Sequence, residues 1–353
     1  MAWCPGAETS TMARTWHGNF PYFVPDLPTI EVETAWGTFQ NVIDSKTSDV
    51  VIPMRQHPVT VVDARTHTPE GLDSWDFETH GFCYLNRPAF DFPDHTVQDR
   101  KQVTAVFAPK VLEAVRKKCK AKKAYWMSHQ RRGEDKVRTA GPGAEGYVLG
   151  FAHSDYGPDF ERQFRTVLCK RYGMSMKDAQ TCDFCVVNMW SPVQWSAFRN
   201  PLCYLDASTI GSMATGAIKY ILPKDTDTGY SYDKVRNHSR PLEERVPIAA
   251  KDAPALAPLY SSNHRWVYCS DMTKDEAVIF KQFDFRKSVD TSTRTTFHRA
   301  FADPFHQKWK DCPPRRSIEC RIILVFDDDE KKEVDKEKEV LTRTTTSTPT
   351  CKL

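Results

Sequence analysis

The chain has 353 residues, 40% of them hydrophobic, which is enough for one large hydrophobic core or two modest ones. Its 49 Lys and Arg nearly balance its 46 Asp and Glu, and the basic residues are scattered, which argues against a nucleic-acid partner. No stretch approaches about 18 uninterrupted apolar residues, and residues 1–20 lack the apolar region of a signal peptide. We therefore expect an intracellular protein that neither is secreted nor spans a membrane.

The 11 cysteines are odd in number and irregularly spaced, so we expect reduced, mostly buried thiols instead of a disulfide framework. Cys182 and Cys185 have the spacing of a redox pair, but no βαβ pattern surrounds them, which favours a structural role. The last three residues, Cys351-Lys352-Leu353, are similar to the Ser-Lys-Leu peroxisomal address. A cytoplasmic and a peroxisomal location both stay open.

Residues 1–60 are rich in Pro and aromatics without a sustained period, so we expect a segment that wraps the core of a single domain covering residues 1–326. Residues 104–124 place Val111, Leu112, Val115 and Cys119 on one face, and lysines crowd the remainder. This pattern predicts an amphipathic helix on the core surface with a solvated basic face.

From about Gly146 the sequence changes to short segments rich in β-branched and aromatic residues, separated by Gly, Pro and Asn. Several short strands with long connections favour a mainly β fold with decorating helices, of the jelly-roll or cupin-like kind. Residues 224–258 are polar and contain Pro, which predicts a surface insertion or lid. Residues 327–353 are charged and then Thr-rich, which predicts a disordered tail. The best strand candidates are residues 147–153, 185–190, 266–269, 277–283, 294–301 and 317–326.

The motif most informative about chemistry is His153-Ser154-Asp155, in a strand-like segment that ends at Gly157-Pro158. Side chains at i and i+2 of a strand share a face, so His153 and Asp155 can bind one metal ion together. A His and a carboxylate are two thirds of the facial triad of non-haem iron(II) oxygenases, which leaves three positions for co-substrate and O₂. His298, 143 residues after Asp155 in another strand-like segment, is the expected third ligand; His306 is the alternative.

A strand-like run from Arg315 to Phe326 follows His298. Two of its arginines, Arg315 and Arg321, are an even number of residues apart, so their side chains would share one face of a strand. The distal carboxylate of 2-oxoglutarate is best held by a guanidinium with a hydroxyl beside it. Arg315 and Ser317 would place a guanidinium and a hydroxyl on one face, so we favour these two residues as the binding site of the distal carboxylate. Arg321 would lie on the same face and remains an alternative.

Several blocks in a fixed order resemble the fungal gibberellin-desaturase-like family, which includes relatives of the cephalosporin 7α-methoxylase small component. The resemblance covers about residues 61–326 and implies a double-stranded β-helix oxygenase of secondary metabolism, with iron bound by His153, Asp155 and His298. One departure is Ser191, where family members commonly carry Arg after the Trp of the Asn-x-Trp block; this change puts the substrate or co-substrate contacts at that position in doubt. The blocks are Phe151–Asp155, Asn188–Pro192, Asn200–Ser208, His264–Tyr268, Ile279–Asp284, Phe297–Pro304 and Arg316–Arg321.

The resulting functional expectation is an oxidoreductase that uses Fe(II), 2-oxoglutarate and O₂ to hydroxylate, desaturate or cyclise a small-molecule intermediate, releasing succinate and CO₂. Asn188, Tyr268 and Lys281 are the expected substrate contacts. A free amino acid as substrate, a zinc or cupin-type metalloenzyme without 2-oxoglutarate, and a non-catalytic scaffold remain alternatives. The sequence sets no expectation for the oligomeric state.

Overall fold

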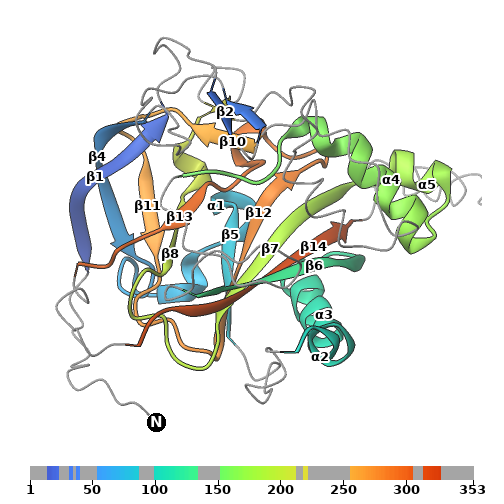
Figure 1. The fold of residues 1–353 in the computed structure, drawn as a ribbon, viewed down its shortest axis with the longest axis horizontal. Coiled ribbons are helices and arrows are strands. Elements are labelled where there is room, and N and C mark those ends of the chain that lie inside the picture. The colour runs from blue at the N-terminus through green and yellow to red at the C-terminus, as the bar shows by residue number, and fades with distance from the viewer. Residues whose placement is uncertain are drawn as a thin grey trace, which may run out of the picture.

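Two facing β-sheets form the centre of the computed structural model (Figure 1). The structure describes residues 14–23, 32–34, 37–39, 54–86, 99–133, 152–211, 218–221, 255–304 and 313–326. The described part is mainly β with a few helices, as the sequence predicts.

The first sheet has the strand order β1-β4-β11-β8-β13. Its neighbours are antiparallel except β4 and β11, which are parallel. Isolated bridges from His153 to His298 and from Ser154 to Leu256 extend the pairing beyond β13. The strands are β1 (Thr15–Phe23), β4 (Met54–Asp63), β11 (Arg265–Tyr268), β8 (Leu202–Leu205) and β13 (His298–Ala300).

The second sheet has the order β5-β12-β7-β14-β6, with every neighbouring pair antiparallel. Its central strand β7 is buried along its whole length, in keeping with its mostly apolar sequence. The strands are β5 (Phe82–Asn86), β12 (Glu276–Asp284), β7 (Phe184–Pro192), β14 (Arg316–Val325) and β6 (Lys123–Gly133). Two small hairpin-like pairs complete the described β-structure: β2 (Val32–Thr34) with β3 (Gly37–Phe39), and β9 (Ile218–Ile221) with β10 (Ala255–Pro258).

Aromatic contacts join the two sheets face to face. The ring of Tyr204 on β8 lies 5.4 Å from Phe82 on β5 and 5.0 Å from Phe280 on β12. Phe280 also lies 4.7 Å from the His298 ring on β13. Tyr204, Phe280 and His298 therefore mark the inner faces of the two sheets.

Short helices cover the ends and the outer face of the second sheet. Helix α3 packs Val111 and Val115 into the same cluster as Val187, Met189 and Ile322 on that face, which confirms the predicted amphipathic helix. The α-helices are α1 (Phe77–His80), α2 (Arg100–Gln102), α3 (Ala108–Lys118), α4 (Glu161–Tyr172) and α5 (Met176–Thr181). One π-helical segment (Val103–Phe107) precedes α3, and 3₁₀ turns span Gly71–Ser74, Pro158–Phe160, Ala207–Thr209 and Thr291–Thr293.

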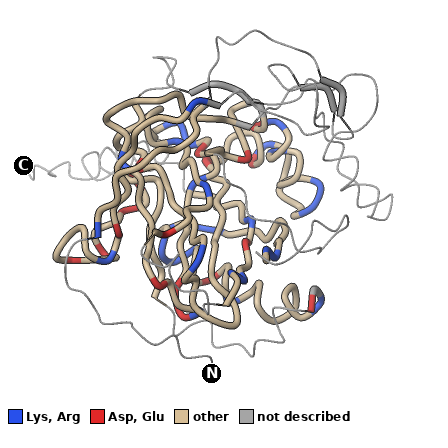
Figure 2. The backbone as a smooth tube through the Cα atoms, turned by 60° about the vertical axis from the view of Figure 1, so that its left-hand side comes forward, with Lys and Arg blue, Asp and Glu red and all other residues tan. Residues whose placement is uncertain are grey.

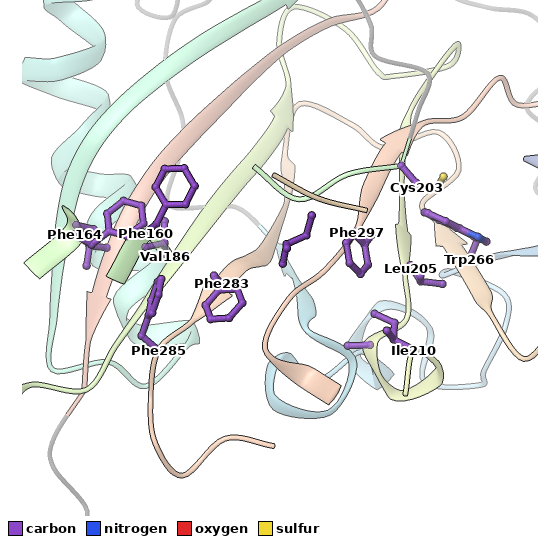
Figure 3. Close-up of a cluster of buried hydrophobic side chains, with 14 of the residues drawn as sticks. Phe160, Phe164, Val186, Cys203, Leu205, Ile210, Trp266, Phe283, Phe285 and Phe297 are labelled. Carbon is purple, nitrogen blue, oxygen red and sulfur yellow. The ribbon is translucent and has the colours of Figure 1, made fainter. Parts of the chain in front are cut away.

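One apolar cluster continues across both sheets and α4 (Figure 3). Phe160 and Phe164 lie beside Val186 at one end of it, and Leu205 and Trp266 lie at the other. Burying large aromatic side chains on this scale is the main favourable contribution to folding, at about 25 cal/mol per Å² of apolar surface. The cluster fixes the relative position of the sheets and hence of the residues between them.

The charged residues do not segregate: blue and red segments alternate along the tube in Figure 2. All eight described cysteines are free and six are buried, as expected for reduced thiols. In the described residues, no helix has the length and apolarity needed to cross a bilayer.

The N-terminal segment differs from its expected role. Residues 15–23 and 54–60 form strands β1 and β4 of the first sheet, and Phe20, Tyr22 and Val59 belong to the core. These described residues thus belong to the first sheet, in which the pairing of β1 with β4 satisfies their backbone hydrogen bonds. The tail 327–353 and most of the insertion 224–258 lie outside the described residues, as does His306.

Candidate metal centre

His153 and His298 lie side by side on neighbouring strand segments. The backbone N–H of His298 donates to the carbonyl of His153 at 3.0 Å, and that of His153 donates to the carbonyl of His298 at 3.2 Å. This reciprocal pair fixes the two side chains on one face, with ring centroids 4.6 Å apart. Both imidazoles are buried.

Asp155 completes the group. Its Oδ1 lies 3.6 Å from Nε2 of His153, and its Oδ2 lies 3.2 Å from Nη2 of Arg321 on β14. Side chains from three segments, around residues 153–155, 298 and 321, therefore meet between the sheets, although 143 residues separate Asp155 from His298.

The pKa shifts of His298 and Asp155 suit binding of a divalent metal. Burial and the neighbouring His153 lower the pKa of His298 to about 3, so its imidazole is neutral at pH 7. Burial alone would raise the pKa of Asp155, but the positive charge of Arg321, aided by His153, lowers it below its usual range. Neutral imidazoles and an ionised carboxylate are the donor forms that a metal requires.

Within the described ranges, no three His, Cys, Asp or Glu side chains already have their ligand atoms grouped as in a metal site. Asp155 instead divides its carboxylate between His153 and Arg321. Metal binding at these residues would thus require local adjustment of side chains that the backbone has already brought together.

The arginine candidates on β14 lie in different environments. Arg321 donates to two carboxylates, Asp155 and, at 3.0 Å, Glu319. Arg315 is buried, donates to the carbonyl of Asn200 at 2.7 Å, and has its guanidinium 5.9 Å from the Trp190 ring centroid. Ser317 is also buried, and its hydroxyl has no hydrogen-bond partner among the described residues.

Asn188 lies on the inner face of the second sheet. It is paired in register with Arg321 on one side and Phe280 on the other, and its neighbour Met189 points to the outer cluster. It is fully buried, and neither its amide nitrogen nor its oxygen has a partner in the described part of the chain. Such unsatisfied atoms are rare in native interiors, which points to a ligand or water at this position.

Tyr268 and Lys281 are not brought to this group. Tyr268 is paired with Cys203, whereas Val267 is paired with Tyr204, the partner of His298, so Tyr268 lies on the opposite face of its sheet. There its ring packs 4.9 Å from Phe301.

Lys281 lies opposite Val187, which belongs to the outer cluster of the second sheet. It is fully buried and ion-paired with Asp284 at 3.0 Å and with Glu78 at 3.4 Å. Strand alternation predicts which residues share a face, but not which face lines the space between the sheets.

Two further residues of this region were not expected from the sequence. Gln282 accepts a hydrogen bond from the backbone N–H of Asp155 at 2.8 Å. Arg132 on β6 lies 3.8 Å from Glu319. A polar residue inside an otherwise apolar strand was the available signal for Gln282; Arg132 gave none, because it stands among other polar residues.

Comparisons with known proteins agree with this architecture. The family model described as "Oxidoreductase/YMDC permease-like domain" matches residues 31–326. The structure is similar to that of an iron and alpha-ketoglutarate-dependent endoperoxidase, NvfI, with a TM-score of 0.64, 19% identity, and coverage of 89% of this chain and 99% of that one. At this identity the likeness shows the fold.

Among curated proteins, the chain is 29% identical over 143 residues to a hydroxylase/desaturase, asaB, of Aspergillus flavus, covering 40% of this chain and 56% of that one. It is 24% identical over 237 residues to an alpha-ketoglutarate-dependent dioxygenase, phiK, of a fungal species, covering 65% and 72%. The match to a hydroxylase/desaturase of Cercospora beticola, at 27% identity, spans 41% of this chain and 38% of the relative. The family model covers far more than half of the chain, so this protein belongs to the Oxidoreductase/YMDC permease-like domain family.

Proposed function

We propose that this protein is an Fe(II)- and 2-oxoglutarate-dependent oxygenase that oxidises a small molecule of fungal secondary metabolism. The observation that carries the proposal is the meeting of His153, Asp155 and His298, two imidazoles and one carboxylate, in the space between two sheets. The activities named for the similar proteins asaB, phiK and NvfI also support the proposal. A double-stranded β-helix is the fold that accompanies this proposal.

His153, Asp155 and His298 would hold iron(II). When bound with 2-oxoglutarate and O₂, the metal supplies the oxidising chemistry, in which 2-oxoglutarate becomes succinate and CO₂. The chain itself orients the ligands and excludes water: both imidazoles are buried, the His298 ring packs on Phe280, and reciprocal backbone hydrogen bonds join His153 to His298. Arg321 keeps Asp155 ionised and in a fixed rotamer through Oδ2.

Arg315 and Ser317 are the residues that we expect to bind the distal carboxylate of 2-oxoglutarate. Arg321 already serves Asp155 and Glu319, so a third carboxylate there would compete with two others. Arg315 has a neutral carbonyl as a hydrogen-bond partner, and the Ser317 hydroxyl lacks a partner in the described residues. A buried guanidinium and a buried hydroxyl two residues apart offer the charge-assisted contacts that a dicarboxylate requires.

Asn188 is assigned a contact to co-substrate or substrate, because both ends of its buried amide lack partners among the residues described. Hydroxylation, desaturation and oxidative cyclisation all remain admissible reactions, since they differ in how the substrate is positioned. A free amino acid is an admissible substrate on the same ground.

The test uses the full chain loaded anaerobically with iron. Given 2-oxoglutarate and O₂, the wild type should release succinate, including the slow release that occurs without prime substrate. Replacement of His153 or Asp155 by Ala should abolish it, while replacement of the exposed Lys117, as a control, should not. Succinate release that continues in H153A, or bound zinc with no dependence on 2-oxoglutarate, would refute the proposal.

A further inference from the structure

Strand β12 contains a β-bulge beside the candidate metal centre. In the pairing of β12 with β7, Lys281 is opposite Val187 and Phe283 is opposite Val186, so Gln282 is the extra residue. A bulge redirects a side chain out of the regular alternation. Gln282 is fully buried, and its side chain reaches the segment that carries His153 and Asp155.

Gln282 holds that segment through two donors, the Asp155 N–H and the Ser154 hydroxyl. Its Oε1 accepts from the backbone N–H of Asp155 at 2.8 Å. Its backbone carbonyl accepts from the Ser154 hydroxyl at 2.7 Å, and Oε1 lies 3.2 Å from the same hydroxyl. The reversed amide would place an NH₂ group against the N–H of Asp155, donor against donor, so the assignment of oxygen and nitrogen follows from the partners.

The same bulge also holds the segment that leads to His298. The hydroxyl of Thr295 donates to the carbonyl of Gln282 at 2.9 Å, and the N–H of Thr296 donates to the carbonyl of Lys281 at 3.0 Å. Thr295 and Thr296 are fully buried. One residue therefore connects both chain segments that bring the three candidate ligands together.

We propose that Gln282 is a positioning residue that sets the spacing of His153 and Asp155 relative to His298. This inference rests on the proposed metal site. Partners that orient metal ligands contribute about 10- to 100-fold in metal affinity. The backbone bonds of the bulge survive substitution, so the side-chain bond to the Asp155 N–H is the part that mutation can remove.

The experiment compares Gln282→Met with Gln282→Glu in the full chain, stripped with a chelator and titrated anaerobically with Co(II). Met has a similar length but no acceptor, whereas Glu keeps an oxygen for the Asp155 N–H. We expect Q282M to weaken Co(II) binding about 10- to 100-fold and Q282E to restore most of the loss. The half-buried Gln102 on α2 provides the matched control Q102M, which should bind as the wild type does.

The outcomes are distinguishable. Co(II) affinity in Q282M equal to the wild type, or equally weak binding in Q282M and Q282E, would overturn the positioning role and leave the metal site standing. Failure of the wild type itself to bind Co(II) would overturn the proposed function together with this inference. If urea titration shows Q282M to be unfolded, Gln282→Leu carries the test, because it also removes the acceptor of the Asp155 N–H; unchanged affinity in Q282L would then count against the role.

Discussion

The buried charge cluster at Arg321 makes the sharpest prediction about stability. Its Nη2 donates to Asp155 at 3.2 Å and to Glu319 at 3.0 Å, with Arg321 and Glu319 only 5% and 3% exposed in their side chains. Arg321→Met would leave two carboxylates without their shared cation. Breaking a buried ion pair by removing one partner costs about 3–5 kcal/mol. Arg132 remains 3.8 Å from Glu319, so we place the loss at the lower end, about 3 kcal/mol.

The penalty depends on pH with a defined sign. Arg321 helps to lower the pKa of Asp155, and a lowered carboxyl pKa contributes stability that is present above the unfolded pKa and lost as the pH falls. The difference between the wild type and R321M should therefore be full at pH 7 and should shrink as the pH falls below about 4. At lower pH the Asp155 carboxyl becomes protonated in the variant and no longer requires the cation.

The assay is urea unfolding followed by tryptophan fluorescence, with chelator present so that metal does not compensate. Arg116→Met is the control: Arg116 pairs with Glu113 on the surface of α3, where solvent screening leaves an ion pair with little effect on stability. Adding Glu319→Gln to R321M should recover part of the loss. Equal, small effects of R321M and R116M would refute the argument that Arg321 compensates buried charge.

Three further predictions concern other parts of the molecule. Asp284→Asn should destabilise the protein by about 3 kcal/mol in urea, because it removes the fully buried carboxylate 3.0 Å from the ammonium of Lys281; a loss below that of R116M would contradict this. His264 should contribute a fall in stability of up to about 1.4 kcal/mol per pH unit between pH 6.5 and about 4, in addition to the contribution of His298, since burial lowers the pKa of His264 to about 4 and the unfolded chain takes up the proton first. The Nδ1 of His264 lies 3.0 Å from the Tyr22 hydroxyl. His264→Gln should make the dependence of stability on pH shallower, whereas an unchanged dependence would exclude a contribution from His264. Arg315→Met should raise the KM for 2-oxoglutarate about 10- to 100-fold with little effect on metal binding, and the reverse pattern would reassign the clamp.

Three strands of the second sheet, β7, β12 and β14, were predictable from the sequence. Each contains several β-branched or aromatic residues in a short segment, a composition typical of strands. β5 and β6 of the same sheet were not predicted. β1 was not predicted, since Thr15–Phe23 contains Gly and Pro and becomes a strand only through its pairing with β4.

The candidate site was predictable in its residues but not in their environments. The His-x-Asp spacing and a later strand-like His pointed to side chains that the structure brings together. Arg315 and Arg321 are expected on the same strand face, so the sequence does not distinguish their roles. The distinction comes from the contact of Arg321 with Asp155, which is 166 residues away in sequence. Such contacts depend on tertiary structure, which local patterns do not encode.

Gln282 shows the same limit more clearly. Its direction follows from a bulge in the pairing of β12 with β7, and a bulge depends on the register between two strands. Tyr268 is a related case. Strand alternation along β11 predicts that Tyr268 and Val267 lie on opposite faces, but it does not predict that the face of Val267 is the one shared with His298.

The most direct test of the proposed metal site is an equilibrium titration of the chelator-stripped protein with Fe(II) under anaerobic conditions, followed by counting bound iron per chain. We predict one iron per wild-type chain and a loss of binding in each of H153A, D155A and H298A, with R116M unchanged. Iron retained at wild-type affinity in any one of the three alanine variants would contradict the shared site and the oxygenase proposal built on it.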